Sequence, residues 1–453
     1  MDLTGKNILI VGAGKSGIAA AELLQKKKMN YMLYDGNEEL SPEKIRGMSG
    51  AVRECEICLG ELTTEVMEWT DLVVMSPGVP TDLPVINQMR DAGIPIWGEI
   101  ELAYHFSRGS LLAITGTNGK TTTTSLLGEI MEAFFEDVYV VGNIGTPYTS
   151  VADKTTDRTV TVAEISSFQL ETAVDFHPQV SAILNITPDH LNRHHTMECY
   201  IKTKESIAKN QKQDEVCVLN YEDEVLRDFA KELKNTVVFF SSKRPLENGF
   251  FYQDGAIYRA KDKKAEKIIE TERLQILGLH NYENVMAATA MADSFGVPME
   301  VIVSVLERFQ AVEHRIEYVV EKRGVKFYND SKGTNPDAAI QGIRAMNRPT
   351  FLIGGGYDKD SEYDEWIEAF DGKVKKLVLI GQTREKIAAC AKKHGFGETV
   401  FADSLQEAMD ICYKEAGSGD AILLSPACAS WGMFDNYEQR GEIFKEYARS
   451  LKE

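Results

Sequence analysis

Residues 113–122 constrain the fold of this chain more than any other stretch, and they read Ala-Ile-Thr-Gly-Thr-Asn-Gly-Lys-Thr-Thr. Apolar residues 111–114 predict a buried strand, the glycines predict a tight turn, and Lys120 and Thr121 begin a helix-compatible segment. A strand, a glycine-rich turn and a helix in this order form a phosphate-binding loop, in which backbone N–H groups hold phosphate oxygens. The lysine would meet the β- and γ-phosphates, and the threonine hydroxyl would coordinate Mg²⁺. The stretch therefore predicts an α/β domain that binds a nucleoside triphosphate.

The loop departs from the standard spacing of its two glycines. Four residues usually separate them, which would place the first glycine at position 114, where this chain has Ile114. Gly116 comes later, so the loop is compact and runs from 116 to 121. A chance Gly-Lys-Thr sequence in a surface turn is the alternative. We favour the phosphate-binding loop because the strand, turn and helix signals fall in register.

Strand and helix patterns alternate along all 453 residues, and this predicts an α/β protein of three tandem domains. A chain of this length exceeds what a single hydrophobic core organises. We place a Rossmann-like domain at residues 1–97 and a central P-loop ATPase-like domain with a mainly parallel sheet at residues 98–310. A second Rossmann-like domain follows at residues 311–453.

The composition, 43% hydrophobic and 26% charged, is that of an ordinary globular protein. A formal net charge of −19 argues against a nucleic-acid partner held by general electrostatics, but not against a nucleotide. The seven scattered cysteines fit reduced thiols, and the CxxC pair Cys55 and Cys58 has no second pair to complete a metal site. Because we find no signal peptide and no run of about twenty apolar residues, we expect a cytoplasmic protein without a membrane partner. We also expect a monomer.

A second glycine-rich turn lies near the N-terminus. Residues 12–17 read Gly-Ala-Gly-Lys-Ser-Gly between an apolar run and a helical pattern, and Asp35 ends the next predicted strand. This is the Rossmann fingerprint, which alone suggests NAD, although such a turn can hold any pyrophosphate at a helix N-terminus. Another turn, with Ser76 and Gly78, follows a further apolar strand. We expect both turns in the ligand crevice at the carboxyl edge of this sheet.

Polar segments follow three predicted strands of the central domain. They contain Asn143, Glu164 and His190 respectively. In a parallel sheet they would meet the phosphate-binding loop at one edge, where a carboxylate and an imidazole could hold Mg²⁺ or organise water. Each alone could equally belong to a turn or a helix cap. Lys204 lies in a helical run, and its surroundings indicate a solvated surface lysine.

The predicted C-terminal domain begins with a dense polar set. His314 and Arg315 open it, Lys332 follows its first strand, and Lys359 follows a glycine-rich turn. The arginine and the lysines could neutralise nucleotide phosphates or substrate carboxylates.

Six motifs resemble, in order, those of the Mur ligases, the ATP-dependent amino-acid-adding enzymes of peptidoglycan synthesis, to which folylpolyglutamate synthase is related. The motifs lie at 116–121, 164–171, 185–190, 278–284, 313–315 and 330–334. Further segments are similar to the members that add D-glutamate to UDP-N-acetylmuramoyl-L-alanine, namely the minimal Rossmann N-terminus and 76–78, 97–102, 354–359 and 425–430. We find no Asp-Asn-Pro-Arg-type motif, which is typical of members that add diaminopimelate or lysine.

The resemblance implies that ATP converts the substrate carboxylate to an acyl phosphate, which the amine of D-glutamate attacks. It assigns catalysis to Lys120, Glu164, His190 and Lys204. It assigns two Mg²⁺ sites to Thr121, Glu164, His190 and Lys204, the last as a carbamate, which reverses the interpretation of a surface lysine. It assigns ATP to Gly116, Thr117, Asn118, Gly119, Lys120, Thr121, Asn281, Asn284 and Arg315.

The resemblance also divides the substrate contacts between the ends of the chain. It assigns the UDP substrate to Gly14, Lys15, Ser16, Asp35, Ser76, Gly78, Asn143, Ser166 and Gln169. It assigns D-glutamate to Lys332, Thr334, Lys359, Ser430 and Tyr437, the last at a position where the family often has phenylalanine.

Two kinds of alternative remain open. The chain could be another amino-acid ligase of the Mur or folylpolyglutamate type. It could also be an NAD-dependent oxidoreductase or a non-catalytic nucleotide-binding regulator built on the N-terminal fingerprint, which predicts no release of ADP.

Overall fold

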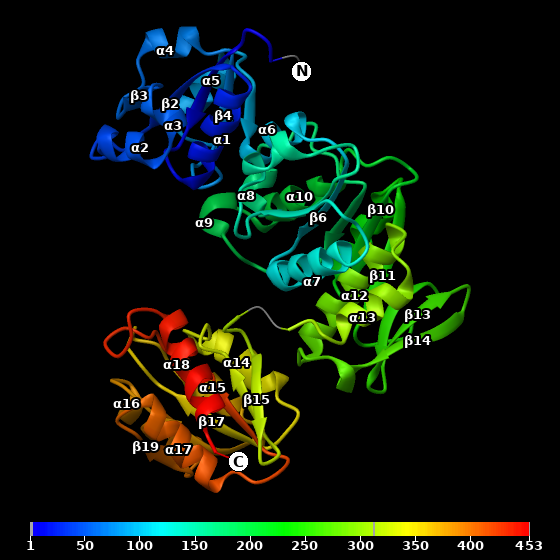
Figure 1. Cartoon of the computed structure of the whole chain (residues 1–453), viewed down its shortest axis with the longest axis vertical. Helices are drawn as coiled ribbons and strands as arrows, with labels where there is room; N and C mark the ends of the chain where they lie inside the picture. Colours follow the sequence, from blue (N-terminus) through cyan, green and yellow to red (C-terminus); the bar gives the residue numbers. More distant parts are fainter. Residues whose placement is uncertain (1–2, 311–312, 453) are drawn as a thin grey trace. The chain divides into compact units, whose positions relative to one another are not determined.

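The computed structural model describes residues 3–310 and 313–452, which form two compact units (Figure 1). The first comprises Met1–Ile269 and Glu283–Val305, and the second comprises Glu270–Tyr282 and Leu306–Glu453. Two β-sheets belong to the first unit and a third sheet belongs to the second. The predicted α/β class is confirmed, whereas the domain boundary near residue 97 stays a prediction.

The first sheet has the strand order β3-β2-β1-β4-β5, and its neighbouring strands are all parallel. Its strands are β1 (Asn7–Val11), β2 (Asn30–Asp35), β3 (Glu56–Leu59), β4 (Leu72–Met75) and β5 (Ile96–Gly98). The accompanying helices are α1 (Lys15–Lys26), α2 (Pro42–Met48), α3 (Gly50–Arg53), α4 (Thr64–Trp69), α5 (Pro84–Asp91) and α6 (Glu99–Phe106). The strand order reverses beside β1, which places the turn after β1 at the point where open sheets bind ligands.

The second sheet has nine strands in the order β14-β13-β12-β11-β10-β9-β6-β8-β7. They are β6 (Ser110–Thr115), β7 (Val138–Gly142), β8 (Val160–Glu164), β9 (Val180–Ile183), β10 (Val216–Asn220), β11 (Thr236–Ser241), β12 (Gly249–Gln253), β13 (Ala256–Lys261) and β14 (Lys264–Glu270). The strands from β7 to β12 pair in parallel, and β12 and β13 form an antiparallel hairpin. The carboxyl ends of β6, β8 and β9 therefore lie together at one edge.

The helices that follow in this part of the chain include α7 (Lys120–Glu132), α8 (Ser167–Leu170), α9 (Leu191–His194), α10 (Met197–Glu205), α11 (Glu224–Glu232), α12 (Leu279–Ser294) and α13 (Met299–Leu306). Short 3₁₀ turns lie at η1 (Tyr148–Ser150), η2 (Ala152–Lys154), η3 (Ser206–Ala208) and η4 (Thr271–Arg273).

The third sheet has the order β15-β16-β20-β17-β18-β19, and only its edge pair β15 and β16 is antiparallel. Its strands are β15 (Glu317–Lys322), β16 (Val325–Asn329), β17 (Thr350–Gly354), β18 (Val374–Leu379), β19 (Thr399–Phe401) and β20 (Ala421–Leu424). Its helices are α14 (Pro336–Ala345), α15 (Asp364–Glu368), α16 (Arg384–Lys393), α17 (Leu405–Glu415) and α18 (Tyr437–Ser450).

The central strands are apolar without alternation. Every residue of β4, β9 and β20 is buried. Parallel strands covered by helices on both faces have this pattern, since neither face meets water. The candidate site residues Asp35 and Glu164 lie at the carboxyl ends of their strands. Among the described helices, none is long and apolar enough to cross a membrane.

Candidate active site

The predicted phosphate-binding loop is present as a strand, a turn and a helix. β6 ends at Thr115 and α7 begins at Lys120. Gly119 caps α7 with φ 86°, in the left-handed region that favours glycine. A Cβ atom at this position would lie 2.2 Å from Oδ1 of Asn284. The turn thus requires glycine both for its backbone and for the close approach of α12.

Asn185 holds the phosphate-binding loop from the end of β9. Its Oδ1 accepts from the N–H of Asn118 at 2.8 Å, and its Nδ2 donates to the carbonyl of Asn118 at 3.1 Å. The carbonyl of Asn185 also accepts from the N–H of Thr117 at 2.9 Å. Asn185 begins the motif at 185–190, but its contact with the loop depends on β6 and β9 being neighbours.

Lys204 is a buried residue of the same site. Its side chain is almost fully enclosed, and its Nζ donates to the carbonyl of Gly116 at 2.8 Å. Lys120 donates to the carbonyls of Gly116 and Thr117, each at 2.9 Å. Burial, with the charge of Lys120 as a second cause, lowers the pKa of Lys204 to about 7, although Asp189 opposes the shift. The interpretation of Lys204 as a solvated surface lysine is therefore wrong.

The lowered pKa of Lys204 predicts that stability depends on pH. In the unfolded chain the lysine amine has a pKa of about 10.4. Between pH 7 and this value, the unfolded chain therefore binds one proton more at Lys204 than the folded chain does. The free energy of unfolding should therefore rise with pH across this window and be independent of this group below it. Between about pH 7 and about pH 9, we expect the free energy of unfolding of the wild type to rise by roughly 2 kcal/mol relative to that of a Lys204→Met variant. Urea unfolding in CO₂-free buffer measures this difference, and a constant difference between the two proteins would contradict it.

Glu164 ends β8 beside the loop and is buried. Its Oε1 accepts from Nδ2 of Asn143 at 2.7 Å, whereas its Oε2 has no hydrogen-bond partner among the residues that the structure describes. A buried carboxylate oxygen without a donor is costly unless a cation neutralises it. Carboxylate oxygen is also the ligand that Mg²⁺ prefers. The residues present thus fit a metal ion at this position.

His190 lies at the exposed rim of the site, with φ 51° and an exposed side chain. Its ring lies 4.9 Å from the ring of Phe168, and its Nε2 lies 3.4 Å from Oδ2 of Asp189. The imidazole is therefore accessible, and its predicted role as a metal ligand stays a prediction.

Ser166 and Gln169 form the helix cap that the sequence left open as an alternative. The Ser166 hydroxyl accepts from the N–H of Gln169 at 3.3 Å, and Oε1 of Gln169 accepts from the N–H of Ser166 at 2.9 Å. These reciprocal bonds are a capping box at the start of α8. Their predicted contact with the UDP substrate stays a prediction.

Arg193 and His194 were not among the predicted site residues. Arg193 donates from Nη2 to Oε2 of Glu171 at 2.7 Å and to the carbonyl of Val79 at 2.8 Å. The buried ring of His194 contacts the Ser167 hydroxyl at 2.9 Å, and burial lowers its pKa. Arg193 thereby fixes the turn after β4, which contains Ser76 and Gly78, to the central sheet.

The N-terminal turn is fixed by Asp35. One carboxylate oxygen accepts from the N–H of Ala13 at 2.9 Å and the other from the N–H of Asn37 at 3.0 Å. Gly12 has φ 103°, and a Cβ there would lie 2.8 Å from Oγ of Ser76. The two predicted turns of this sheet therefore meet. A cavity of about 410 Å³ adjoins the first of these turns, lined in part by Gly14, Lys15 and Ser150.

In the second unit, two predicted lysines lie over aromatic rings. Nζ of Lys332 is 5.7 Å from the ring centroid of Tyr437, and Nζ of Lys359 is 4.5 Å from that of Trp431. The predicted residue Ser430 is buried in the loop after β20. These cation–π contacts hold the two lysine side chains beside the rings.

Three sequence patterns of one family match successive parts of the chain. The Mur ligase MurD-like N-terminal domain matches residues 6–98, the Mur ligase middle domain matches 114–292, and the Mur ligase glutamate ligase domain matches 314–428. The chain belongs to the Mur ligase family.

Curated Mur ligases match over the full length of the chain. The UDP-N-acetylmuramoylalanine–D-glutamate ligase of Lachnoclostridium phytofermentans is 56% identical over 453 residues, covering 100% of both chains. The enzyme of the same name from Lachnospira eligens is 55% identical over 452 residues, again covering 100% of both. The solved UDP-N-acetylmuramate-alanine ligase MurC of Thermotoga maritima has a TM-score of 0.58 at 20% identity, covering 99% of this chain and 100% of that one. At this identity the structural likeness shows the fold.

Arg440 is a further residue of this Mur ligase that the sequence did not single out as a site residue. Its guanidinium is fully buried and donates to the Ser331 hydroxyl at 2.9 Å, the Ser331 carbonyl at 2.7 Å and the Cys428 carbonyl at 3.2 Å. It thereby fixes the turn that carries Lys332 to the loop that carries Ser430. The sequence around Arg440 gives no sign that this side chain points into the core, because that depends on how α18 packs.

Asp330 lies behind the same turn of the Mur ligase. Ser425 donates to its Oδ2 at 2.7 Å, and the N–H of Ile316 donates to its Oδ1 at 3.3 Å. Burial raises the pKa of Asp330 to about 7, and the hydrogen bond from Ser425 opposes this shift. Asp330 thus fixes the backbone beside Arg315.

The structure brings the predicted residues together in two groups. The first unit gathers the phosphate-binding loop, Glu164, Lys204 and Asn284. The second unit contains the remaining predicted nucleotide and D-glutamate residues, namely Asn281, Arg315, Lys332, Thr334, Lys359, Ser430 and Tyr437. The individual roles assigned to these residues stay predictions.

Proposed function

We propose that this Mur ligase uses ATP and Mg²⁺ to join D-glutamate to UDP-N-acetylmuramoyl-L-alanine, releasing ADP and phosphate, in the synthesis of a peptidoglycan precursor. The observation that carries the proposal is the 56% identity, over the whole of both chains, with a UDP-N-acetylmuramoylalanine–D-glutamate ligase. The match of residues 314–428 to the glutamate ligase domain supports glutamate as the amino acid that is added.

The chemistry requires activation of a carboxylate. Its negative charge repels an amine and oxide is a poor leaving group, so phosphorylation must precede amide formation. The phosphate-binding loop would hold the ATP phosphates through backbone N–H groups at the start of α7. Lys120 would leave the loop carbonyls that it now contacts and meet the β- and γ-phosphates.

Bound Mg²⁺ would neutralise charge on the transferring phosphoryl group. Glu164 would hold one ion through its unpartnered Oε2, with the hydroxyl of Thr121 at the start of α7. We assign a second ion to His190 and Lys204.

Lys204 can act as an oxygen ligand only after covalent change. A neutral lysine amine adds to CO₂ and loses a proton, which gives a carbamate whose single negative charge is shared by two oxygens. Its lowered pKa, about 7, makes the neutral amine abundant at physiological pH. Carbamylation would also replace a buried cation beside Lys120 by an anion, which removes the repulsion between the two side chains.

The N-terminal turn would hold the UDP end of the substrate. Gly14, Lys15 and Ser16 begin α1, where N–H groups suit a pyrophosphate. This assignment replaces NAD, which the fingerprint alone suggested.

For D-glutamate, the two carboxylates require cations, and Lys332 and Lys359 supply them. We expect Lys359→Ala to raise the KM for D-glutamate about 10- to 100-fold, because the loss of one charge-assisted hydrogen bond has an effect of this size. The KM for ATP should be unchanged. Steady-state release of phosphate measures both constants. Lys386→Ala is the matched control, because Lys386 is also exposed and its Nζ lies 3.3 Å from Asp358. An equal effect in the control, or an equal rise in both constants, would contradict a D-glutamate contact.

ADP release with UDP-N-acetylmuramoyl-L-alanine, with and without D-glutamate, tests the function. We expect release that depends on D-glutamate and not on L-alanine or diaminopimelate. Activity with either of these would identify another amino-acid ligase, and NAD reduction without ADP release would identify an oxidoreductase.

The proposed substrates are small molecules, and we propose that the enzyme works in the cytoplasm as a monomer. Light scattering after size-exclusion chromatography checks the mass of 50.5 kDa.

A further inference from the structure

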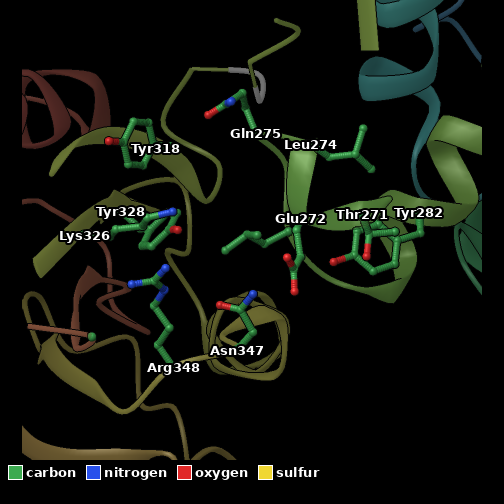
Figure 2. Close-up of a pocket in the computed structure, with 12 residues that line it drawn as sticks. Thr271, Glu272, Leu274, Gln275, Tyr282, Tyr318, Lys326, Tyr328, Asn347 and Arg348 are labelled. Atoms are coloured by element: carbon green, nitrogen blue, oxygen red, sulfur yellow. The ribbon is translucent and has the colours of Figure 1, made fainter. Parts of the chain in front are cut away.

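A cavity of about 590 Å³ lies within the second unit, outside the residues assigned above. One wall comes from β15, β16 and the turn before β17, and the other from the segment 271–282 (Figure 2). Its size is in the range of pockets that enclose small organic ligands.

The sheet-side wall carries two cations. The side chains of Lys326 and Arg348 come from β16 and the turn before β17, and Figure 2 shows both beside Tyr328. Neither cation has an ion pair with a carboxylate among the described residues. Glu321 is opposite Lys326 in the strand register but does not approach it within 4.0 Å. Two cations without a bound carboxylate favour an anion.

Tyr328 adds a buried phenol to this wall. Only 3% of the residue is exposed, and what remains accessible lines the cavity. Burial raises its pKa to about 12, and the nearby charge of Arg348 opposes the shift. The hydroxyl therefore stays protonated at neutral pH and can donate to a ligand in the cavity.

Aromatic faces lie beside the cations. The rings of Tyr318 and Tyr328 pack edge to face with centroids 5.9 Å apart, and Nζ of Lys326 is 5.8 Å from the Tyr318 ring. The opposite wall offers polar groups from Glu272 and Gln275, which Figure 2 shows across the cavity. Such groups suit the hydroxyls and ring edges of a nucleoside, while the cations suit its phosphate.

We propose that this cavity is a second nucleotide site, which binds a nucleoside monophosphate with the phosphate on Lys326, Arg348 and the Tyr328 hydroxyl. The arginine side chain can donate hydrogen bonds to two phosphate oxygens at once, and the lysine ammonium and the phenol hydroxyl can donate to the third. The base and ribose extend along the tyrosines toward Glu272 and Gln275. The site does not depend on the proposed ligase reaction, because none of its residues belongs to that assignment.

One residue that lines the cavity also contacts a residue predicted to bind ATP. The carbonyl of Leu277, which lines the cavity, accepts from Nδ2 of Asn281 at 2.8 Å. Asn281 is one of the predicted ATP contacts. A nucleotide in the cavity would therefore contact the segment that leads into α12.

Hydrogen–deuterium exchange of the full chain with UMP, AMP or inorganic phosphate tests the proposal. We expect at least one nucleotide to slow exchange in segments 271–278 and 318–328, and inorganic phosphate to act only at concentrations about 10-fold higher. Arg348→Ala should weaken this protection about 10- to 100-fold, and Tyr328→Phe several-fold. Arg344→Ala, which removes an exposed arginine of α14, should leave it unchanged.

Protection by nucleotides at the phosphate-binding loop or the N-terminal turn reports other sites and should survive Arg348→Ala. If Arg348→Ala does not fold, Arg348→Lys keeps the charge and should still weaken protection by losing the two-oxygen grip. The proposal is overturned if neither nucleotide protects these segments at about 5 mM, far above the range of ordinary ligand sites. It is equally overturned if Arg348→Ala keeps the protection, or if phosphate alone protects as strongly as the nucleotides.

Discussion

Replacing Lys204 by alanine is expected to lower D-glutamate-dependent ADP release about a thousand-fold. The buried Lys204 amine contacts the carbonyl of Gly116, in the loop proposed to hold ATP, and alanine leaves nothing there to carry a carbamate. The proposed metal ion would lose one anionic ligand, so the loss should fall on kcat more than on the KM for ATP.

Chemical rescue separates this role from a structural one. Acetate or formate should restore part of the activity of Lys204→Ala by supplying a free carboxylate, whereas chloride at equal ionic strength should not. Lys202→Ala is the control, because Lys202 lies on the same helix but is exposed and pairs with Glu198 at 2.6 Å. Rescue by every salt, or a comparable loss in Lys202→Ala, would contradict the carbamate.

Replacing Glu164 by glutamine is expected to lower kcat by about 10²- to 10³-fold and to raise the Mg²⁺ concentration needed for half-maximal activity. Glutamine keeps the shape of the side chain and can still accept from Asn143. It lacks the negative charge of the unpartnered oxygen. Steady-state ADP release over a Mg²⁺ titration measures both effects.

Thermal unfolding provides the control for Glu164→Gln. A buried carboxylate with one unpartnered oxygen destabilises the metal-free fold, so the variant should be as stable as the wild type, or more so, without Mg²⁺. Added Mg²⁺ with a nucleotide should raise the Tm of the wild type more than that of the variant. A large loss of stability in metal-free buffer would instead indicate a structural role.

Much of the fold followed from local sequence. The apolar runs of the parallel strands and the glycines of the turns predicted the strand, turn and helix around Lys120, because those signals act over a few residues. The hairpin of β12 and β13 is likewise a local feature, since its two strands are adjacent in the chain.

Lys204 shows where local sequence fails. Its neighbours in α10 resemble a solvated helix, and only the family resemblance indicated a buried role. The contact that encloses it joins residues 204 and 116, which are 88 positions apart. The helix pattern contains no information about what packs against it.

The sequence by itself determined the α/β class, the nucleotide-binding loop and, through its motifs, the family. These depend on residue types at short spacings. The tertiary structure alone decided that the buried Arg440 joins two loops through hydrogen bonds and that Asn185 binds the phosphate-binding loop. It also decided that Glu164 has an oxygen without a partner among the described residues. Each of these depends on which strands become neighbours and on which side chains lose water, and both are properties of packing between distant segments.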